Sequence, residues 1–410
     1  MHFLFMSVPE RDHLLPHLAV GKELARRGHR VDFVTGRPLA GLVESYGLTP
    51  LRYDSVLENL PARPENPGLD DVAAVLALGV EDSEALIRAV ESAYGDNRPD
   101  LIAYDVSSGT AGRILERKWG LPAAQLHTEF AQNDEFACKQ LFADEQTPGK
   151  PRNARRWTEQ PELRPWAKRL EELLAKHGLD TPFAGFTAAT GDFNLVYVPK
   201  ALQPAAGSFD ERFVFVGPCV DRRDSLDSWD QRANGLPLVL VSLDTVCHRD
   251  IALLRTCVRA FGDAPVHVVL AVGDGVEVAA LGELPPNIET RKWVSRVTVL
   301  AHASAVVTRG GISCVTDALS AAVPVVAVPG GPLARVTGVQ VARPGLGRSL
   351  PEPGVDADRL RDTVLSLIGD REVARRLAWM RRQIERAGGV ARAASTLEQR
   401  ARWAPPSGAR

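Results

Sequence analysis

The stretch AVVTRGGISCVTDALSAAVPVVAVPGG, which spans residues 305–331, constrains the fold of this chain more than any other segment. A short apolar run leads into Arg309 and a Gly-Gly pair, a helical pattern follows, and a valine-rich run comes next. The pattern predicts a strand over 305–308, a helix over 313–322 and a second strand over 324–329. A strand, a crossover helix and a strand in this order are typical of a parallel sheet.

The Gly310-Gly311 turn stands where the first strand gives way to the helix. Glycines at such a turn let the backbone come close to a ligand, and the N–H groups and dipole of a helix N-terminus favour an anion. Arg309 adds a permanent positive charge that suits a diphosphate. Because Gly-Gly turns are common, a plain turn beside a surface arginine is the alternative, and this segment alone leaves both open.

The length of 410 residues is too great for one ordinary core and predicts two domains. Strands alternate with helices in both halves, including helices over 109–119 and 251–261, so each half is expected to be a doubly wound parallel α/β sheet. The predicted division is a first domain over 1–216, a polar linker over 217–236, a second domain over 237–390 and a helical tail over 391–410. Packing of that tail back on the first domain is one arrangement open to it.

Composition and charge argue against several classes of protein. The formal net charge is −2, so nothing points to nucleic acid or to an anionic membrane as a partner. The apolar runs are short and strand-like, so no membrane-spanning segment is expected, and the N-terminus is typical of a buried strand rather than of a signal peptide. The five cysteines are scattered without a CxxC pair, which favours a reducing cytoplasm over a disulfide framework or a zinc site.

Two blocks of the sequence resemble the GT-B nucleotide-sugar glycosyltransferases, and within them the bacterial enzymes that glycosylate macrolide, enediyne and similar antibiotics. The N-terminal block is DHLLPHLAVGKELARRGHRVDFVTG, which is similar to the family's GH-x-x-P and R-G-H-x-V pattern. The C-terminal block runs from FVFVGPC through PLVLVSLDT and PPNIETRKWVSRVTVLAHA to the Gly-Gly segment, and then to LGRSLP and RRQIERAGG. The resemblance implies the GT-B fold, in which two Rossmann-like, doubly wound parallel-sheet domains face each other across a cleft.

The resemblance also implies a catalytic pair. His13 matches the histidine of the family's GH-x-x-P loop, where it would take a proton from an acceptor hydroxyl, as an imidazole can near neutral pH. Asp105, at the end of PDLIAYD, matches the carboxylate that would fix the tautomer of that imidazole and stabilise the imidazolium. A solvated loop histidine and an N-cap aspartate are the alternatives. His17 and His29, which lie close by in the sequence, are expected to be structural.

A second group of residues is implied to bind the nucleotide-sugar donor. Trp293 matches the tryptophan of the family's W-V-P-Q loop, whose ring stacks on the nucleobase, and a core tryptophan at a strand end is the alternative. Thr245 matches a residue near the phosphates, and Asp317 falls where the family has a glutamate that holds the ribose hydroxyls. The residues implied to bind the donor are Trp293, Thr245, Asp244, Arg296, Arg309, Gly310, Gly311, Ser313 and Asp317.

Several of these positions depart from the family pattern. Asp244 replaces the glycine of S-L-G-T, which puts a carboxylate where the diphosphate would approach and within reach of pairing with an arginine. Arg309 replaces the histidine of H-G-G, and Arg296 replaces the glutamine of W-V-P-Q. Leu333 and Ala334 stand where the family has polar residues that hold the sugar hydroxyls. The loss of these family residues is consistent with a donor that has few hydroxyls, such as a deoxysugar. It is equally consistent with a site that no longer binds a nucleotide sugar.

The sequence therefore predicts an inverting glycosyltransferase that moves a sugar or deoxysugar from a dTDP- or UDP-sugar to a hydroxyl of an antibiotic-type natural product. The resemblance implies no metal and no cofactor besides the nucleotide sugar, because a helix terminus and cations stabilise the leaving diphosphate. The alternative is a protein of this fold that has lost donor binding and serves as an auxiliary binding protein, or uses His13 and Asp105 for another proton transfer. The expected partners are the natural product and the nucleotide sugar, without nucleic acid or integral membrane contact. A homodimer is left open. The expected location is the cytoplasm.

Overall fold

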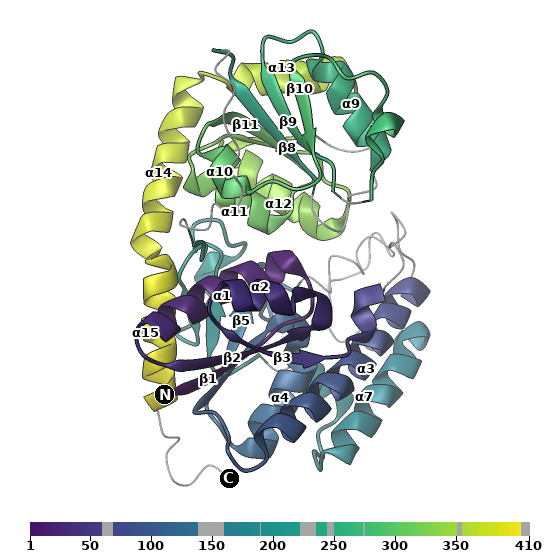
Figure 1. Ribbon diagram of the computed structural model, residues 1–410, viewed down its shortest axis with the longest axis vertical. Coiled ribbons are helices and arrows are strands. Elements are labelled where there is room, and N and C mark those ends of the chain that lie inside the picture. Colours follow the sequence, from purple (N-terminus) through teal and green to yellow (C-terminus); the bar gives the residue numbers. More distant parts are fainter. Residues whose placement is uncertain are drawn as a thin grey trace. The chain divides into compact units, whose positions relative to one another are not determined.

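The structure, a computed structural model, describes residues 1–59, 69–137, 160–188, 190–221, 235–243, 250–273, 275–350 and 355–402. Asp244, Thr245 and most of the predicted linker lie outside the described residues. The chain divides into two compact units (Figure 1). The first unit comprises Met1–Val198, Ala205–Asp221 and Ala387–Arg410, and the second comprises Pro199–Pro204 and Arg222–Arg386.

The first unit contains a seven-stranded parallel sheet in the order β3-β2-β1-β4-β5-β6-β7. Its strands are β1 (His2–Met6), β2 (Arg30–Gly36), β3 (Thr49–Tyr53), β4 (Leu101–Asp105), β5 (Ala123–His127), β6 (Asn194–Val196) and β7 (Phe213–Phe215). Strand β1 pairs with β2 on one side and with β4 on the other, so the strand order reverses at this point. The carboxyl ends of strands at such a reversal are where open α/β sheets bind ligands.

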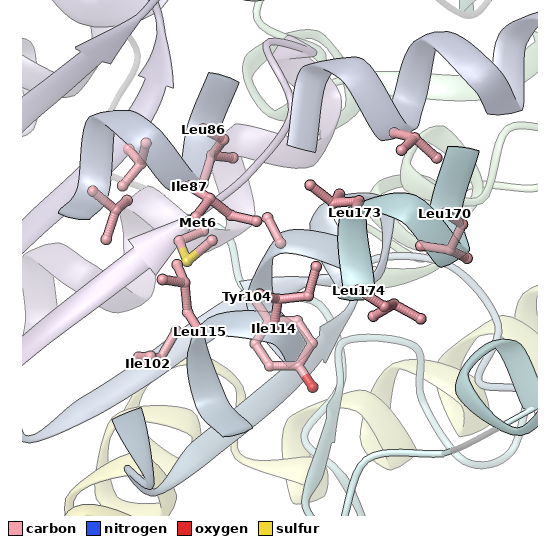
Figure 2. Packing of buried hydrophobic residues seen from close by; sticks show 14 of the residues in the cluster. Met6, Leu86, Ile87, Ile102, Tyr104, Ile114, Leu115, Leu170, Leu173 and Leu174 are labelled. Atoms are coloured by element: carbon pink, nitrogen blue, oxygen red, sulfur yellow. The ribbon is translucent and has the colours of Figure 1, made fainter. Parts of the chain in front are cut away.

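Helices cover both faces of the first sheet. They are α1 (Arg11–Arg26), α2 (Ala40–Ser45), α3 (Leu69–Tyr94), α4 (Gly109–Trp119), α7 (Arg164–Lys176), α8 (Phe183–Ala188) and α15 (Gly389–Arg402). On one face, α3 and α7 lie side by side and pack with α4 on Met6, Ile102 and Tyr104 of the sheet (Figure 2). On the other face, α1 and α15 pack on residues such as Phe3 and Phe33.

Polar contacts hold the C-terminal helix α15 against the end of α1. The Nη1 atom of Arg27 lies 3.1 Å from the Oε2 atom of Glu398, and Nε2 of His29 lies 2.8 Å from Oε1 of the same carboxylate. Leu397 beside them is fully buried in the core of the first unit. These contacts join residues 371 and 369 positions apart, and the described part of the predicted tail belongs to the first unit.

The second unit contains a six-stranded parallel sheet in the order β10-β9-β8-β11-β12-β13. Its strands are β8 (Leu238–Ser242), β9 (His267–Ala271), β10 (Ile288–Arg291), β11 (Ala303–Thr308), β12 (Val325–Ala327) and β13 (Gly347–Ser349). Its helices are α9 (Ile251–Phe261), α10 (Arg296–Leu300), α11 (Ile312–Ser320), α12 (Pro332–Ala342), α13 (Ala357–Leu367) and α14 (Arg371–Ala387). The strand order reverses between β8 and β11, and Arg309 directly follows β11.

The sequence predictions of parallel α/β architecture are confirmed. The helices expected over 109–119 and 251–261 are α4 and α9, and the strand–turn–helix–strand segment forms β11, α11 and β12. In that segment, α11 ends two residues earlier than expected and β12 is shorter. Over the described residues, no helix is both long and apolar enough to cross a membrane. The described cysteines, Cys219, Cys257 and Cys314, are buried free thiols.

Candidate active site

Asp105 ends β4 and lies fully buried at the reversal point of the first sheet. Its Oδ1 atom accepts a hydrogen bond from the backbone N–H of Ser107 at 2.8 Å and another from the hydroxyl of the same residue. This is the capping geometry of a short 3₁₀ helix over Val106–Ser108, so the predicted N-cap alternative describes part of its role. The cap fixes the carboxylate so that its remaining acceptor positions face α1 and the end of β5.

His13 lies in the first turn of α1, and its Nδ1 atom is 3.1 Å from Oδ1 of Asp105. The sequence placed this histidine in a loop, and that expectation is wrong because the helix already begins at Arg11. The side chain is only 17% exposed, which also contradicts the solvated alternative. An ionised carboxylate can only accept, so the proton of the neutral ring sits on Nδ1 and the lone pair on Nε2. Glu10, at 3.8 Å from Nε2, is the carboxylate nearest to that lone pair among the ion pairs seen here.

Thr128 is a site residue that sequence reasoning missed. It directly follows β5, the neighbour of β4, and its hydroxyl lies 2.9 Å from Nδ1 of His13 and 3.3 Å from Oδ2 of Asp105. The hydroxyl can therefore accept from the ring and donate to the carboxylate. Its position after a strand beside β4 was the only signal for it in the sequence.

His17 binds the same carboxylate as His13. Its Nε2 atom lies 2.8 Å from Oδ2 of Asp105, and its Nδ1 atom lies 3.2 Å from the hydroxyl of Tyr197. His17 was expected to be structural, and the structure shows its ring fully buried in contact with the carboxylate of the site. The spacing of His13 and His17 could have indicated this contact, because residues four apart on a helix share a face and both histidines can turn toward one acceptor.

The pair of Asp105 and His13 is strongly coupled electrostatically. Burial alone would raise the pKa of Asp105, but the charge of His13 and the hydrogen bonds from His13 and His17 hold that pKa well below its usual range. Burial has the opposite effect on a histidine and lowers the pKa of His13. The charge and hydrogen bond of Asp105, and then the charges of Glu129 and Glu10, outweigh burial and raise that pKa above its ordinary value. The site therefore holds a permanent carboxylate beside an imidazole whose protonated form is stabilised.

In the second unit, Arg309 is buried rather than exposed. The residue is 8% exposed, its Nη2 atom lies 3.3 Å from Oδ2 of Asp250, and its Nη1 atom donates to the carbonyl of Val328 at 3.3 Å. The guanidinium lies directly against Gly330, where a Cβ atom would come within 2.2 Å of Nη2. The alternative of a surface arginine is therefore wrong: the side chain joins the N-cap of α9 to the loop after β12.

The Gly310-Gly311 turn brings two helix N-termini together. Gly310 has φ +91°, and a Cβ atom there would lie 3.0 Å from the carbonyl oxygen of Ala334 in the first turn of α12. Gly311 is the N-cap of α11 and Gly331 that of α12, so neither helix has a side-chain cap. Adjacent uncapped helix starts are the arrangement that favours an anion, although the N–H of Gly310 also donates to Thr308 Oγ1 at 3.3 Å.

Three of the predicted donor-binding residues contact one another. The Nε atom of Arg296 lies 3.0 Å from Oδ2 of Asp317, and its Nη2 atom donates to the hydroxyl of Ser313 at 3.1 Å. The carboxylate expected to meet the ribose hydroxyls is thus bound by an arginine. Trp293 is 44% exposed, so the alternative of a core tryptophan is wrong. Asp244 and Thr245 lie outside the described residues, and their predicted roles remain predictions.

Two further features of the described residues lie away from these groups. A hollow of about 500 Å³ lies between α15 and the β6–β7 side of the first sheet, lined by Phe193, Val214, Arg392 and Arg400 among others, and no predicted site residue lines it. The part of the chain that the structure describes contains no group of three or more histidine, cysteine or acidic side chains arranged to hold a metal ion.

Several known proteins resemble this chain in sequence and in architecture. Residues 255–385 match the family described as "Erythromycin biosynthesis protein CIII-like, C-terminal domain". The oleandomycin glycosyltransferase of Streptomyces antibioticus is 34% identical over 405 residues, which cover 97% of this chain and 90% of that protein. The demethyllactenocin mycarosyltransferase of Streptomyces fradiae is 32% identical over 405 residues, with 97% and 86% covered.

Among solved structures, the calicheamicin glycosyltransferase CalG4 superposes with a TM-score of 0.83 at 35% identity, over 98% of this chain and 99% of that chain. Identity above 30% across nearly the full length establishes a family relationship, and the two parallel-sheet units have the architecture of the GT-B fold. The chain therefore belongs to the bacterial antibiotic-type GT-B glycosyltransferases and is itself a glycosyltransferase.

Proposed function

We propose that the enzyme transfers a sugar from a nucleoside diphosphate to a hydroxyl group of a natural product, with His13 as general base and with inversion at the anomeric carbon. The observation that carries the proposal is the contact of 3.1 Å between Nδ1 of His13 and the buried carboxylate of Asp105. The names of the relatives support the substrates, since two are named for oleandomycin and demethyllactenocin, the second as a mycarosyltransferase.

The proposed chemistry follows from which ring nitrogen is available. The acceptor hydroxyl donates to Nε2 of His13, and its oxygen attacks the anomeric carbon as the bond to the diphosphate breaks. The proton passes to Nε2, and Asp105 stabilises the imidazolium that results. A single displacement of this kind inverts the configuration of the anomeric carbon, whereas a covalent sugar–enzyme intermediate would retain it.

On the donor side, we assign the diphosphate to the paired starts of α11 and α12, at Gly311 and Gly331. Backbone N–H groups at two helix N-termini would stabilise the negative charge that develops on the leaving group, so no metal is needed for that purpose. The first turn of α12 offers the apolar side chains of Leu333 and Ala334, which supports a donor sugar with few hydroxyl groups.

The test of the proposal is transfer from dTDP- and UDP-linked sugars to macrolide-type acceptors in the presence of excess EDTA. We expect a glycoside whose anomeric configuration, determined from the NMR coupling constant, is opposite to that of the donor. Retained configuration would contradict the single displacement, and loss of activity that added Mg²⁺ restores would contradict the metal-free assignment.

The second candidate function, a protein that has lost donor binding, is favoured by one observation. Both arginines expected to meet the donor are already in ion pairs, Arg296 with Asp317 and Arg309 with Asp250. Calorimetric titration with dTDP and UDP separates the two functions. Binding at or below millimolar concentration supports transfer, and its absence for both nucleotides supports the auxiliary role.

Trp293→Ala is expected to weaken nucleotide binding by roughly 5- to 150-fold, since stacking of a base on an aromatic ring contributes about 1–3 kcal/mol. Thermal stability should change little, because the ring is 44% exposed. Trp379 on α14 is equally exposed in the same unit, so Trp379→Ala is the matched control. The dissociation constant of dTDP or UDP is the quantity to measure, and equal effects of the two substitutions would remove Trp293 from the nucleotide site.

A further inference from the structure

The carboxylate of Asp105 binds two histidines from one helix. Oδ1 is 3.1 Å from Nδ1 of His13, and Oδ2 is 2.8 Å from Nε2 of His17. Of these two contacts the one with His17 is the shorter, and both partners in it are fully buried. The residue that holds Asp105 most closely from α1 is therefore not the proposed base but the histidine one helical turn after it.

The ring of His17 is itself fixed from its other side. Nδ1 lies 3.2 Å from the hydroxyl of Tyr197, which follows β6, and the two ring centroids are 5.4 Å apart. Burial raises the pKa of Tyr197 well above its ordinary value, so the phenol keeps its proton. Because the ionised carboxylate can only accept, Nε2 of His17 donates to it, and Nδ1 forms the second hydrogen bond of the ring, with the phenol of Tyr197. Tyr197, His17, Asp105 and His13 thus form one continuous chain of hydrogen bonds.

We propose that His17 is a positioning residue for sugar transfer, which orients the carboxylate of Asp105 and thereby sets the basicity of His13. The inference depends on the proposed role of His13 as general base. A hydrogen bond to one oxygen of a carboxylate withdraws charge from the other, so the donor on Oδ2 weakens the pull of Oδ1 on the proton at Nδ1. Without that donor, His13 would hold its proton to a higher pH and its ring would be less well oriented.

Other charged and polar groups that face His13 and Asp105 come from the neighbouring elements. Glu10 precedes α1, while Glu129 follows β5, and both raise the pKa of His13. His127 at the end of β5 is buried, and burial lowers its pKa to about 4, so it adds no charge near neutral pH. Thr128 and Ser107 contribute neutral hydroxyls. Substitution of His17 leaves all of these in place, so a change in the titration of His13 can be traced to the lost donor.

The test compares His17→Phe, which removes the donor, with His17→Gln, whose amide N–H can still reach Oδ2. The titration midpoint of His13 is followed by NMR of nitrogen-labelled histidine, and the pH dependence of kcat/KM is measured in parallel. We expect the phenylalanine variant to shift both toward higher pH by about one unit, so that kcat/KM at neutral pH falls about tenfold. We expect the glutamine variant to restore most of the loss.

The matched control is His29→Gln, which removes another paired histidine of the first unit that contacts Glu398 rather than Asp105. It should leave the titration of His13 unchanged. A folded His17→Phe or His17→Leu variant with the wild-type midpoint and pH profile would overturn the inference.

If neither apolar variant folds, the inference is tested by NMR of the wild-type protein. The Nε2 resonance of His17 should respond to the titration of His13 through their shared carboxylate, and independent titration of the two rings would overturn the inference. The NMR midpoint requires no turnover, so it distinguishes this inference from the proposed function. If His13→Ala retained full activity, the general-base role would fail while the coupling of the two histidines could still be measured.

Discussion

His13→Ala is expected to lower the turnover of sugar transfer by about 100- to 10,000-fold, the range that a positioned general base contributes. The substitution removes the Nε2 lone pair, and none of the neighbouring groups replaces it. Asp105 is fully buried behind the ring, and the hydroxyl of Thr128 is a far weaker base than imidazole. Glu10, whose Oε2 atom lies 3.8 Å from Nε2 of His13, is about half exposed and does not occupy the position of that lone pair.

The dissociation constant of the nucleotide is expected to stay the same in this variant, because the residues assigned to the donor lie in the other unit. Single-turnover rates and calorimetric titration with dTDP or UDP provide the two measurements. His29→Ala serves as the control for loss of a histidine near α1. Unchanged turnover would exclude His13 from the mechanism, and loss of nucleotide binding together with turnover would point to a structural rather than a chemical effect.

The fold could be predicted from local signals where helix ends are encoded in the sequence. Helix α9 begins after Asp250, whose side chain accepts from the N–H of Leu253 at 2.9 Å, and α4 ends at Gly120 in the left-handed conformation. Both helices were predicted with correct bounds. Neither β3 nor the long helix α3 was predicted. For β3 the physical reason is that TPLRY contains proline and arginine and shows little alternation of apolar and polar residues.

The candidate site was predictable only in part, because its polar contacts depend on tertiary packing. The strands that end near His13 and Asp105 lie side by side, and the resemblance had already paired the two residues. The ion pairs of Arg296 with Asp317 and of Arg309 with Asp250 join residues 21 and 59 positions apart, so neither pair follows from local sequence. The sequence suggested Asp244, which lies outside the described residues, as a partner for these arginines, and it paired neither arginine with the carboxylate that the structure shows.

Asp105→Asn is expected to lower turnover by up to about 10,000-fold, the loss that a wrong histidine tautomer causes in a Ser-His-Asp triad. An asparagine can turn its NH₂ group toward His13, which would place the proton of the ring on Nε2 and the lone pair on Nδ1. The acceptor hydroxyl would then meet a donor instead of a base. The substitution also removes the charge that, together with hydrogen bonding, outweighs the effect of burial and keeps the pKa of His13 above its ordinary value.

The prediction also fixes the direction in which the pH profile of kcat/KM should shift. In the wild type, the base form of His13 is populated only as the pH rises toward its raised pKa, so kcat/KM should increase through neutral and mildly alkaline pH. In Asp105→Asn that pKa falls, so the much lower rate should reach its plateau at a lower pH. Asp82→Asn is the matched control, since Asp82 is also buried and hydrogen-bonded, to Tyr53 and Ser55, without contact to His13. A pH profile of Asp105→Asn with the wild-type midpoint would show that Asp105 does not set the protonation of the base, even if turnover fell.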